Sequence, residues 1–100
     1  MARSKTRTRK FDAARYLEKE SETIAYLEGA LEDGDHSVIA AALGDIARAR
    51  GMSLVARKAR LGRESLYKAL ASNGNPQLST VLSVLRALGL TLRVTPIATD

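Results

Sequence analysis

Residues 53–70 read SLVARKARLGRESLYKAL, and this stretch decides the fold. Two short runs with helical spacing, Leu54 to Ala59 and Arg63 to Ala71, are separated by a tight turn. This spacing is typical of a helix-turn-helix, whose two helices cross steeply, so that a small residue is needed where they approach and apolar residues must fill the space between them. Ala56 is the small residue, and the rest of the predicted core of the motif is Val55, Ala59, Leu61, Leu66, Ala69 and Leu70.

The outward side of the same stretch is basic, because Arg57, Lys58, Arg60, Arg63 and Lys68 are opposed by Glu64 alone. A plain helical hairpin in a small bundle would not need these cations, so the pattern favours a DNA-binding surface. A recognition helix places its N-terminal residues at base edges in the major groove, and the preceding helix crosses the phosphates. The predicted base-reading residues are Arg63, Glu64, Ser65, Tyr67 and Lys68, and the predicted backbone contacts are Ser53, Arg57, Lys58 and Arg60. Alternatively, Glu64 only pairs with Lys68 one turn later.

Helical periodicity extends to both sides of this motif. Residues 20–33 form one amphipathic run that Gly34 ends, and a second run over 37–50 follows the capping residues Asp35 and Ser37 and ends at Gly51. Ser53 is expected to cap the run that starts at Leu54. Further helices are predicted over 13–18 and 77–88, the latter ending at Gly89, with Pro76 either closing the preceding loop or opening the helix. The predicted fold is an all-α, lambda-repressor-like five-helix domain with an N-terminal helical extension.

The last segment, LTLRVTP at 90–96, alternates apolar and polar residues and predicts one short strand. A lone strand leaves its backbone groups unpaired, so we expect it to pair with the same strand of a second copy. Packing against its own domain is the alternative. A homodimer is expected also because a single module buries too little surface to select an operator in a genome.

Composition limits what else the chain can be. One hundred residues, 45% of them hydrophobic, suit one domain, which we divide into a disordered basic arm (1–10), an acidic helical extension (11–34), the helix-turn-helix core (35–89) and the strand (90–96). The chain has no cysteine and one histidine, His36, so no metal or other cofactor is expected. No catalytic motif supports an enzyme. No apolar run is long enough for a membrane span, so a cytoplasmic location is expected.

The span from Phe11 to Val94 resembles the addiction-module antidote family, the HigA-like antitoxins with an Xre or lambda-repressor-type helix-turn-helix. The stretches that carry the resemblance are YLEGALEDGD, IAAALGDIARARGMS, LVARKARLGRESLYKAL, GNPQLSTVLSVLRALGL and LTLRV. The resemblance implies a DNA-binding autorepressor of a two-gene operon that neutralises a RelE- or HigB-like toxin, which cleaves mRNA. One departure is Arg60, which stands where the motif usually has glycine. A left-handed turn there would cost ~1 kcal/mol, so either the turn differs or the charge compensates.

Charge is unevenly distributed, since residues 11–45 carry nine acids against two bases. A toxin that binds mRNA must itself be basic, so an acidic surface on the antidote increases the rate at which the two proteins associate. Apolar residues of the same region, including Tyr16, Leu17, Tyr26 and Leu27, are expected to divide between core and toxin contact. The predicted toxin-binding residues are Glu18, Glu22, Glu28, Glu32 and Asp33. Three alternatives stay open: a merely solvated acidic face, a stand-alone helix-turn-helix transcriptional regulator without a toxin, and an antidote that no longer binds DNA.

Overall fold

The structure, a computed structural model, describes residues 19–98, and every regular element in this range is a helix. The predicted all-α class is therefore confirmed for these residues, with helices close to the expected bounds. The predicted arm over 1–10 and helix over 13–18 lie outside the described residues. The helices are α2 (Glu20–Asp33), α3 (His36–Arg50), α4 (Met52–Ala59), α5 (Arg63–Ala69) and α6 (Leu78–Ala87).

The ends of the first two helices follow the predicted signals. Gly34 has φ 82° and its N–H donates to the carbonyl of Ala30, which ends α2 in a left-handed cap. Asp35 then caps α3, because its carboxylate accepts from the backbone N–H of Ser37 at 2.8 Å and from the Ser37 hydroxyl at 2.7 Å. These hydrogen bonds lower the pKa of Asp35 below its ordinary value, and the bond from the Ser37 hydroxyl has the largest effect.

The predicted cap at Ser53 is wrong. The helix α4 begins one residue earlier, at Met52, with Gly51 as its N-cap and Ser53 exposed within its first turn. Gly51 also ends α3, and its φ of 103° turns the chain from one helix directly into the next. No side chain caps the first turn of α4, and glycine at the N-cap is only a few tenths of a kcal/mol less favourable than a capping side chain.

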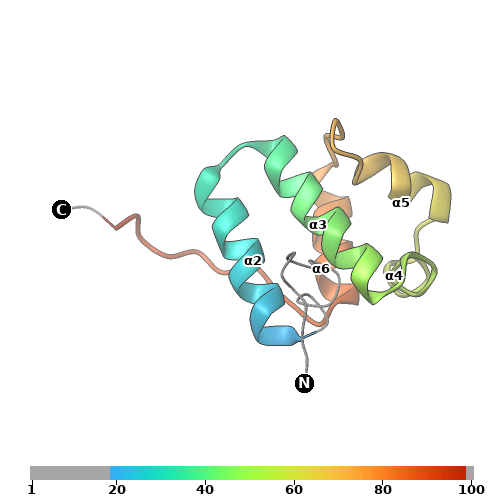
Figure 1. Ribbon diagram of the computed structural model, residues 1–100, viewed down its shortest axis with the longest axis horizontal. Coiled ribbons are helices and arrows are strands. Elements are labelled where there is room, and N and C mark those ends of the chain that lie inside the picture. Colours follow the sequence, from blue (N-terminus) through green and yellow to red (C-terminus); the bar gives the residue numbers. More distant parts are fainter. Residues whose placement is uncertain (1–18, 99–100) are drawn as a thin grey trace, which may run out of the picture.

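One core joins the helices. Figure 1 shows α3 between α2 on one side and the pair α4 and α5 on the other, with α6 behind α3. The largest fully buried apolar side chains come from α3, α4, α6 and the α5 region: Leu43, Ile46, Val55, Leu66, Leu70 and Val84. Gly44 of α3 lies against the backbone after α5, where a Cβ atom would be 2.6 Å from the carbonyl oxygen of Leu70. Glycine is thus required there by close packing.

The strand predicted over 90–96 does not form in the single chain. After α6, Gly89 takes φ 80°, Leu90 packs partly against the core, and residues 91–98 are exposed and without regular structure. Val94 is fully exposed and Ile97 is 86% exposed, so the alternative of packing onto the chain's own helices is wrong for these two. The segment leaves the helical body (Figure 1). Every regular element within residues 19–98 is a helix, so this segment has no described strand with which to pair.

Candidate nucleic-acid interface

The helices α4 and α5 are joined by Arg60, Leu61 and Gly62 and share one packed interior. The residues that sequence analysis assigned to this interior are found there. Leu66 and Leu70 are fully buried, Leu61 and Ala69 are partly buried against the core, and Val55, Ala56 and Ala59 of α4 are buried. The two short helices therefore form a fixed platform whose outer side chains are free to contact another molecule.

The turn between them is strained at Arg60. Arg60 has φ 60° and ψ 42°, the left-handed conformation, and among the described residues it is the only non-glycine with positive φ. Its N–H bonds to Arg57, and the N–H of Leu61 bonds to the carbonyl of Ala56 at 2.9 Å, which closes the end of α4. Arg60 therefore keeps the left-handed turn, and the alternative that the turn differs is wrong. A residue with a side chain is less stable than glycine by ~1 kcal/mol in this left-handed conformation.

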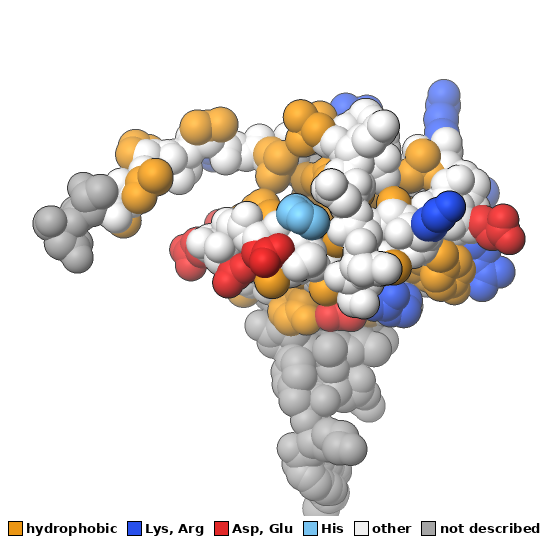
Figure 2. Space-filling model, turned by 90° about the horizontal axis from the view of Figure 1, so that it is seen from above, with side chains coloured by type: hydrophobic (Ala, Val, Ile, Leu, Met, Phe, Trp, Pro, Cys, Tyr) orange, Lys and Arg blue, Asp and Glu red, His pale blue; other side chains and the backbone are white. Residues whose placement is uncertain are grey.

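The outer side of this platform is basic. Figure 2 shows Lys and Arg side chains gathered toward the end formed by α4 and α5, whereas acidic side chains lie mainly toward α2. All nine residues predicted to contact bases or phosphates are exposed: Ser53, Arg57, Lys58, Arg60, Arg63, Glu64, Ser65, Tyr67 and Lys68. We call the five cations of this set, Arg57, Lys58, Arg60, Arg63 and Lys68, the basic face.

Two side chains of α5 are organised relative to each other. The guanidinium of Arg63 donates to the hydroxyl of Tyr67 at 3.3 Å and lies over the Tyr67 ring. The alternative pairing of Glu64 with Lys68 is not found, because the one salt bridge of the described part of the chain joins Arg48 to Asp45. Glu64 thus projects from the first turn of α5 without an ion-pair partner.

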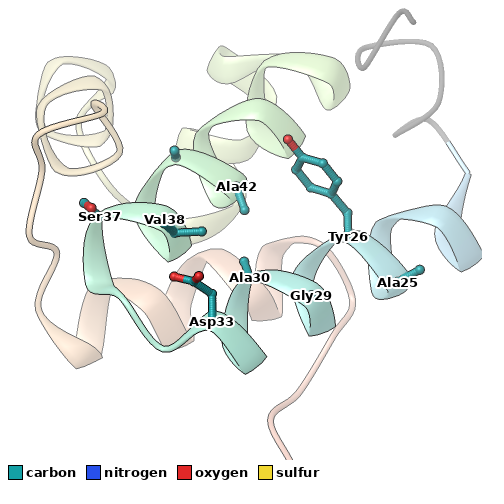
Figure 3. A pocket seen from close by; sticks show the side chains of 9 residues that line it. Ala25, Tyr26, Gly29, Ala30, Asp33, Ser37, Val38 and Ala42 are labelled. Atoms are coloured by element: carbon teal, nitrogen blue, oxygen red, sulfur yellow. The ribbon is translucent and has the colours of Figure 1, made fainter.

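A second surface lies on the other side of α3. Of the predicted acidic set, Glu28, Glu32 and Asp33 are exposed on α2 and Glu22 is partly exposed, whereas Glu18 lies outside the described residues. We call these four side chains of α2 the acidic surface. An open groove of about 660 Å³ runs between α2 and α3 beside it. The lining residues are Ala25, Tyr26, Gly29, Ala30, Asp33, Ser37, Val38, Ala41 and Ala42 (Figure 3).

Tyr26 closes one end of this groove and is held in place by α3. Its hydroxyl donates to Asp45 at 2.7 Å, and Asp45 also accepts from Arg48 at 2.9 Å. The hydrogen bond to the Asp45 carboxylate, together with partial burial, raises the pKa of Tyr26 above 10.0. At the other end lies Asp33, whose carboxylate accepts from the backbone N–H of Asp35 at 3.4 Å.

Sequence reasoning missed the groove and both tertiary hydrogen bonds that link α2 to α3. Besides the Tyr26 contact, Arg50 donates to the hydroxyl of the fully buried Thr23 at 3.0 Å. Polar residues on two different helices carry no signal of pairing in a single sequence. A signal for the groove was present, because Gly29 interrupts an otherwise strong helical run.

Comparison with known proteins gives one family and one relative. Residues 7–96 match the family described as "Probable addiction module antidote protein". An uncharacterized protein of Haemophilus influenzae is 49% identical over 84 residues, which is 84% of this chain and 87% of that protein. No solved structure matches the chain. Within residues 19–98, none of the helices is long and apolar enough to cross a membrane.

Proposed function

Because this chain belongs to the family of probable addiction module antidote proteins, we propose that it is a type II antitoxin with two binding activities. Through α4 and α5, acting as a lambda-repressor-like helix-turn-helix, it binds operator DNA and represses its own operon. Through its acidic surface it binds and neutralises a RelE- or HigB-like toxin that cleaves mRNA. Both activities are binding without catalysis, and the protein acts in the cytoplasm. The basic face on a rigid two-helix platform is the observation that carries the proposal.

The geometry of α5 suits a recognition helix. It begins at Arg63, and its residues Arg63, Glu64 and Ser65 are exposed, so its N-terminal end presents side chains that can reach base edges in a major groove. Arg63 and Lys68 suit the O6 and N7 acceptors of guanine. Glu64, which has no ion-pair partner within residues 19–98, can accept from the N4 amino group of cytosine. Ser65 and Tyr67 lie exposed on the same short helix.

The remaining cations suit the phosphates. Arg57 and Lys58 are exposed in the last turn of α4, and Arg60 is exposed in the turn itself. Contacts of this kind position a protein on the duplex and make binding salt-dependent without reading sequence. The strained backbone at Arg60 supports this role, because strained backbone conformations of non-glycine residues cluster at functional sites.

The exposed end of the chain supports dimerisation. Val94 and Ile97 are apolar side chains in water, and residues 91–97 have unpaired backbone groups. In an antiparallel pair centred on Leu92, Leu90 of each copy lies opposite Val94 of the other, and Arg93 lies opposite Thr91 rather than opposite a second Arg93. Two copies joined in this way would bind two operator half-sites roughly 34 Å apart.

The experiment is footprinting on the DNA upstream of the gene, at two salt concentrations, with coexpression of the protein encoded by the neighbouring reading frame. We expect a protected site with two-fold symmetry, affinity that falls steeply with salt, and copurification of a small basic protein that cleaves mRNA when alone. Protection without a partner would identify a stand-alone regulator. A partner without protection would restrict the protein to toxin binding.

A further inference from the structure

Gly29 lies in the middle of α2, where residues 19–98 give no reason for glycine. Its φ is not positive, and a Cβ atom at this position would meet no atom within 4 Å. Gly44 is the opposite case, because a Cβ atom there would collide with the carbonyl oxygen of Leu70. Since glycine within a helix is less favourable than alanine, α2 is less stable than it would be with alanine at this position, and the glycine gives no gain in internal packing.

The open space at Gly29 is the middle of the groove between α2 and α3. Ala25 and Gly29 line it from α2, Val38 and Ala41 line it from α3, and the buried Ala30 and Ala42 lie beneath them. A cavity of ~150 Å³ accommodates benzene, so a groove of about 660 Å³ has room for several side chains of another molecule. Tyr26, fixed by Asp45, and Asp33 stand at its two ends (Figure 3).

Charge indicates what kind of molecule fits. Asp33 lies in the groove itself, Glu22 is one turn from Tyr26 on α2, and Asp35 and Asp45 flank the α3 side. Arg48, which lies two turns beyond Ala41 on α3, is already paired with Asp45. An apolar groove with an acidic rim complements a basic helix that inserts apolar side chains between its own lysines and arginines.

We propose that this groove receives one helix of the basic toxin, and that Gly29 is glycine so that this helix can approach α2 closely. The inference rests on the proposed toxin-binding function and locates the centre of that contact. Apolar side chains of the toxin pack on Ala25, Gly29 and Ala41, the Tyr26 ring forms one wall, and toxin cations face Asp33 and Glu22. The acidic surface attracts the toxin, whereas the groove retains it.

The test uses the full chain and the protein encoded by the neighbouring reading frame, with affinity measured by calorimetry. Gly29→Leu fills the groove and should weaken binding about 10- to 100-fold, mainly through faster dissociation. Gly29→Ala should raise Tm by about 4–8 °C while weakening binding less. Ser21→Leu is the matched control, because Ser21 is exposed on α2 and outside the groove. It should bind like the parent.

Each outcome either supports or overturns the assignment of the groove to a toxin helix. Parent-like affinity of Gly29→Leu would overturn the groove assignment while leaving toxin binding intact, and failure of the parent to bind would refute the proposed function itself. If Gly29→Leu loses its helical circular dichroism, Ala41→Leu fills the same groove from α3 and replaces it. Nuclear Overhauser contacts between residues 1–18 and the Ala25 or Ala41 methyl groups in the free protein would assign the groove to the chain's own N-terminal segment and overturn the proposal.

Discussion

The Arg63 guanidinium donates to the Tyr67 hydroxyl at 3.3 Å and its central carbon lies 5.3 Å from the centre of the Tyr67 ring. The two residues are one helical turn apart, so they form a cation–π pair on the exposed side of α5. Holding the long Arg63 side chain in one orientation reduces the conformational entropy that it would lose on binding a base. Tyr67 is therefore expected to act through Arg63 as well as by direct contact.

Replacing Arg63 and Lys68 together by Ala should abolish sequence-specific protection of the operator, because each good base contact is worth ~1–3 kcal/mol of discrimination. Both side chains are exposed, so Tm should change little. Footprinting tests this. A double variant with Lys19→Ala and Arg86→Ala removes the same charge from exposed positions outside α4, α5 and the C-terminal segment, and should keep the parent footprint. An unchanged footprint for the Arg63 and Lys68 variant would refute the assignment of α5.

Replacing Arg60 by Gly should increase the free energy of unfolding by about 1 kcal/mol, because glycine adopts the left-handed conformation without strain. The same change should weaken operator and random DNA alike and reduce the slope of log affinity against log salt by about 1. Urea unfolding and salt titrations measure the two effects. Arg57→Ala is the control, since it should lower DNA affinity without stabilising the fold. Stabilisation with unaltered DNA affinity would remove Arg60 from the interface.

Changing Glu18, Glu22, Glu28 and Glu32 together to Gln should leave folding and operator recognition intact but slow association with the toxin. The decrease in association rate should be largest at low salt, because at high salt the ions already screen electrostatic steering in the parent. Stopped-flow binding at two ionic strengths measures it. Parent-like association rates at both would mean that these carboxylates form only a solvated face.

Deleting residues 91–100 should shift the protein toward monomer and weaken operator binding far more than binding to random DNA. Leu90 is retained because it packs partly against the core. Sedimentation equilibrium decides the outcome. If the truncated protein stays dimeric, the interface lies elsewhere, and the exposed Leu78 and Leu82 of α6 are then the residues to change.

The contact between Tyr26 and Asp45 predicts a loss of stability at alkaline pH. The folded-state pKa of Tyr26 is raised above its ordinary 10.0, chiefly by the hydrogen bond to Asp45. Its contribution is therefore complete below pH 10 and is lost as pH rises through the folded-state pKa. Tyr26→Phe should lower stability by about 1 kcal/mol at neutral pH. The difference from the parent, measured by urea unfolding, should stay constant up to about pH 10 and shrink as the pH rises further. A difference that does not shrink above pH 10 would contradict this assignment.

Local features of this chain were readable from the sequence, because they depend on neighbours along the chain. The spacing of apolar residues predicted α2 to α6, and Gly34, Asp35 and Gly89 marked helix ends that the structure confirms. The cap at Ser53 was mistaken because Gly51 alone can end one helix and begin the next. The resemblance to antidote proteins, which the family match supports, likewise rested on contiguous stretches of sequence.

Only the tertiary structure decided which segments that are distant in the sequence contact one another. It showed that residues 91–98 find no partner among the residues that the structure describes, that Arg60 keeps the left-handed turn, and that the Tyr26 hydroxyl donates to Asp45 on another helix. It also separated two glycines that look alike in sequence, since Gly44 touches the backbone at Leu70 and Gly29 faces an open groove. The physical reason is that periodicity encodes which side of a helix is apolar, whereas strand pairing, close backbone contacts and grooves depend on where other elements come to lie.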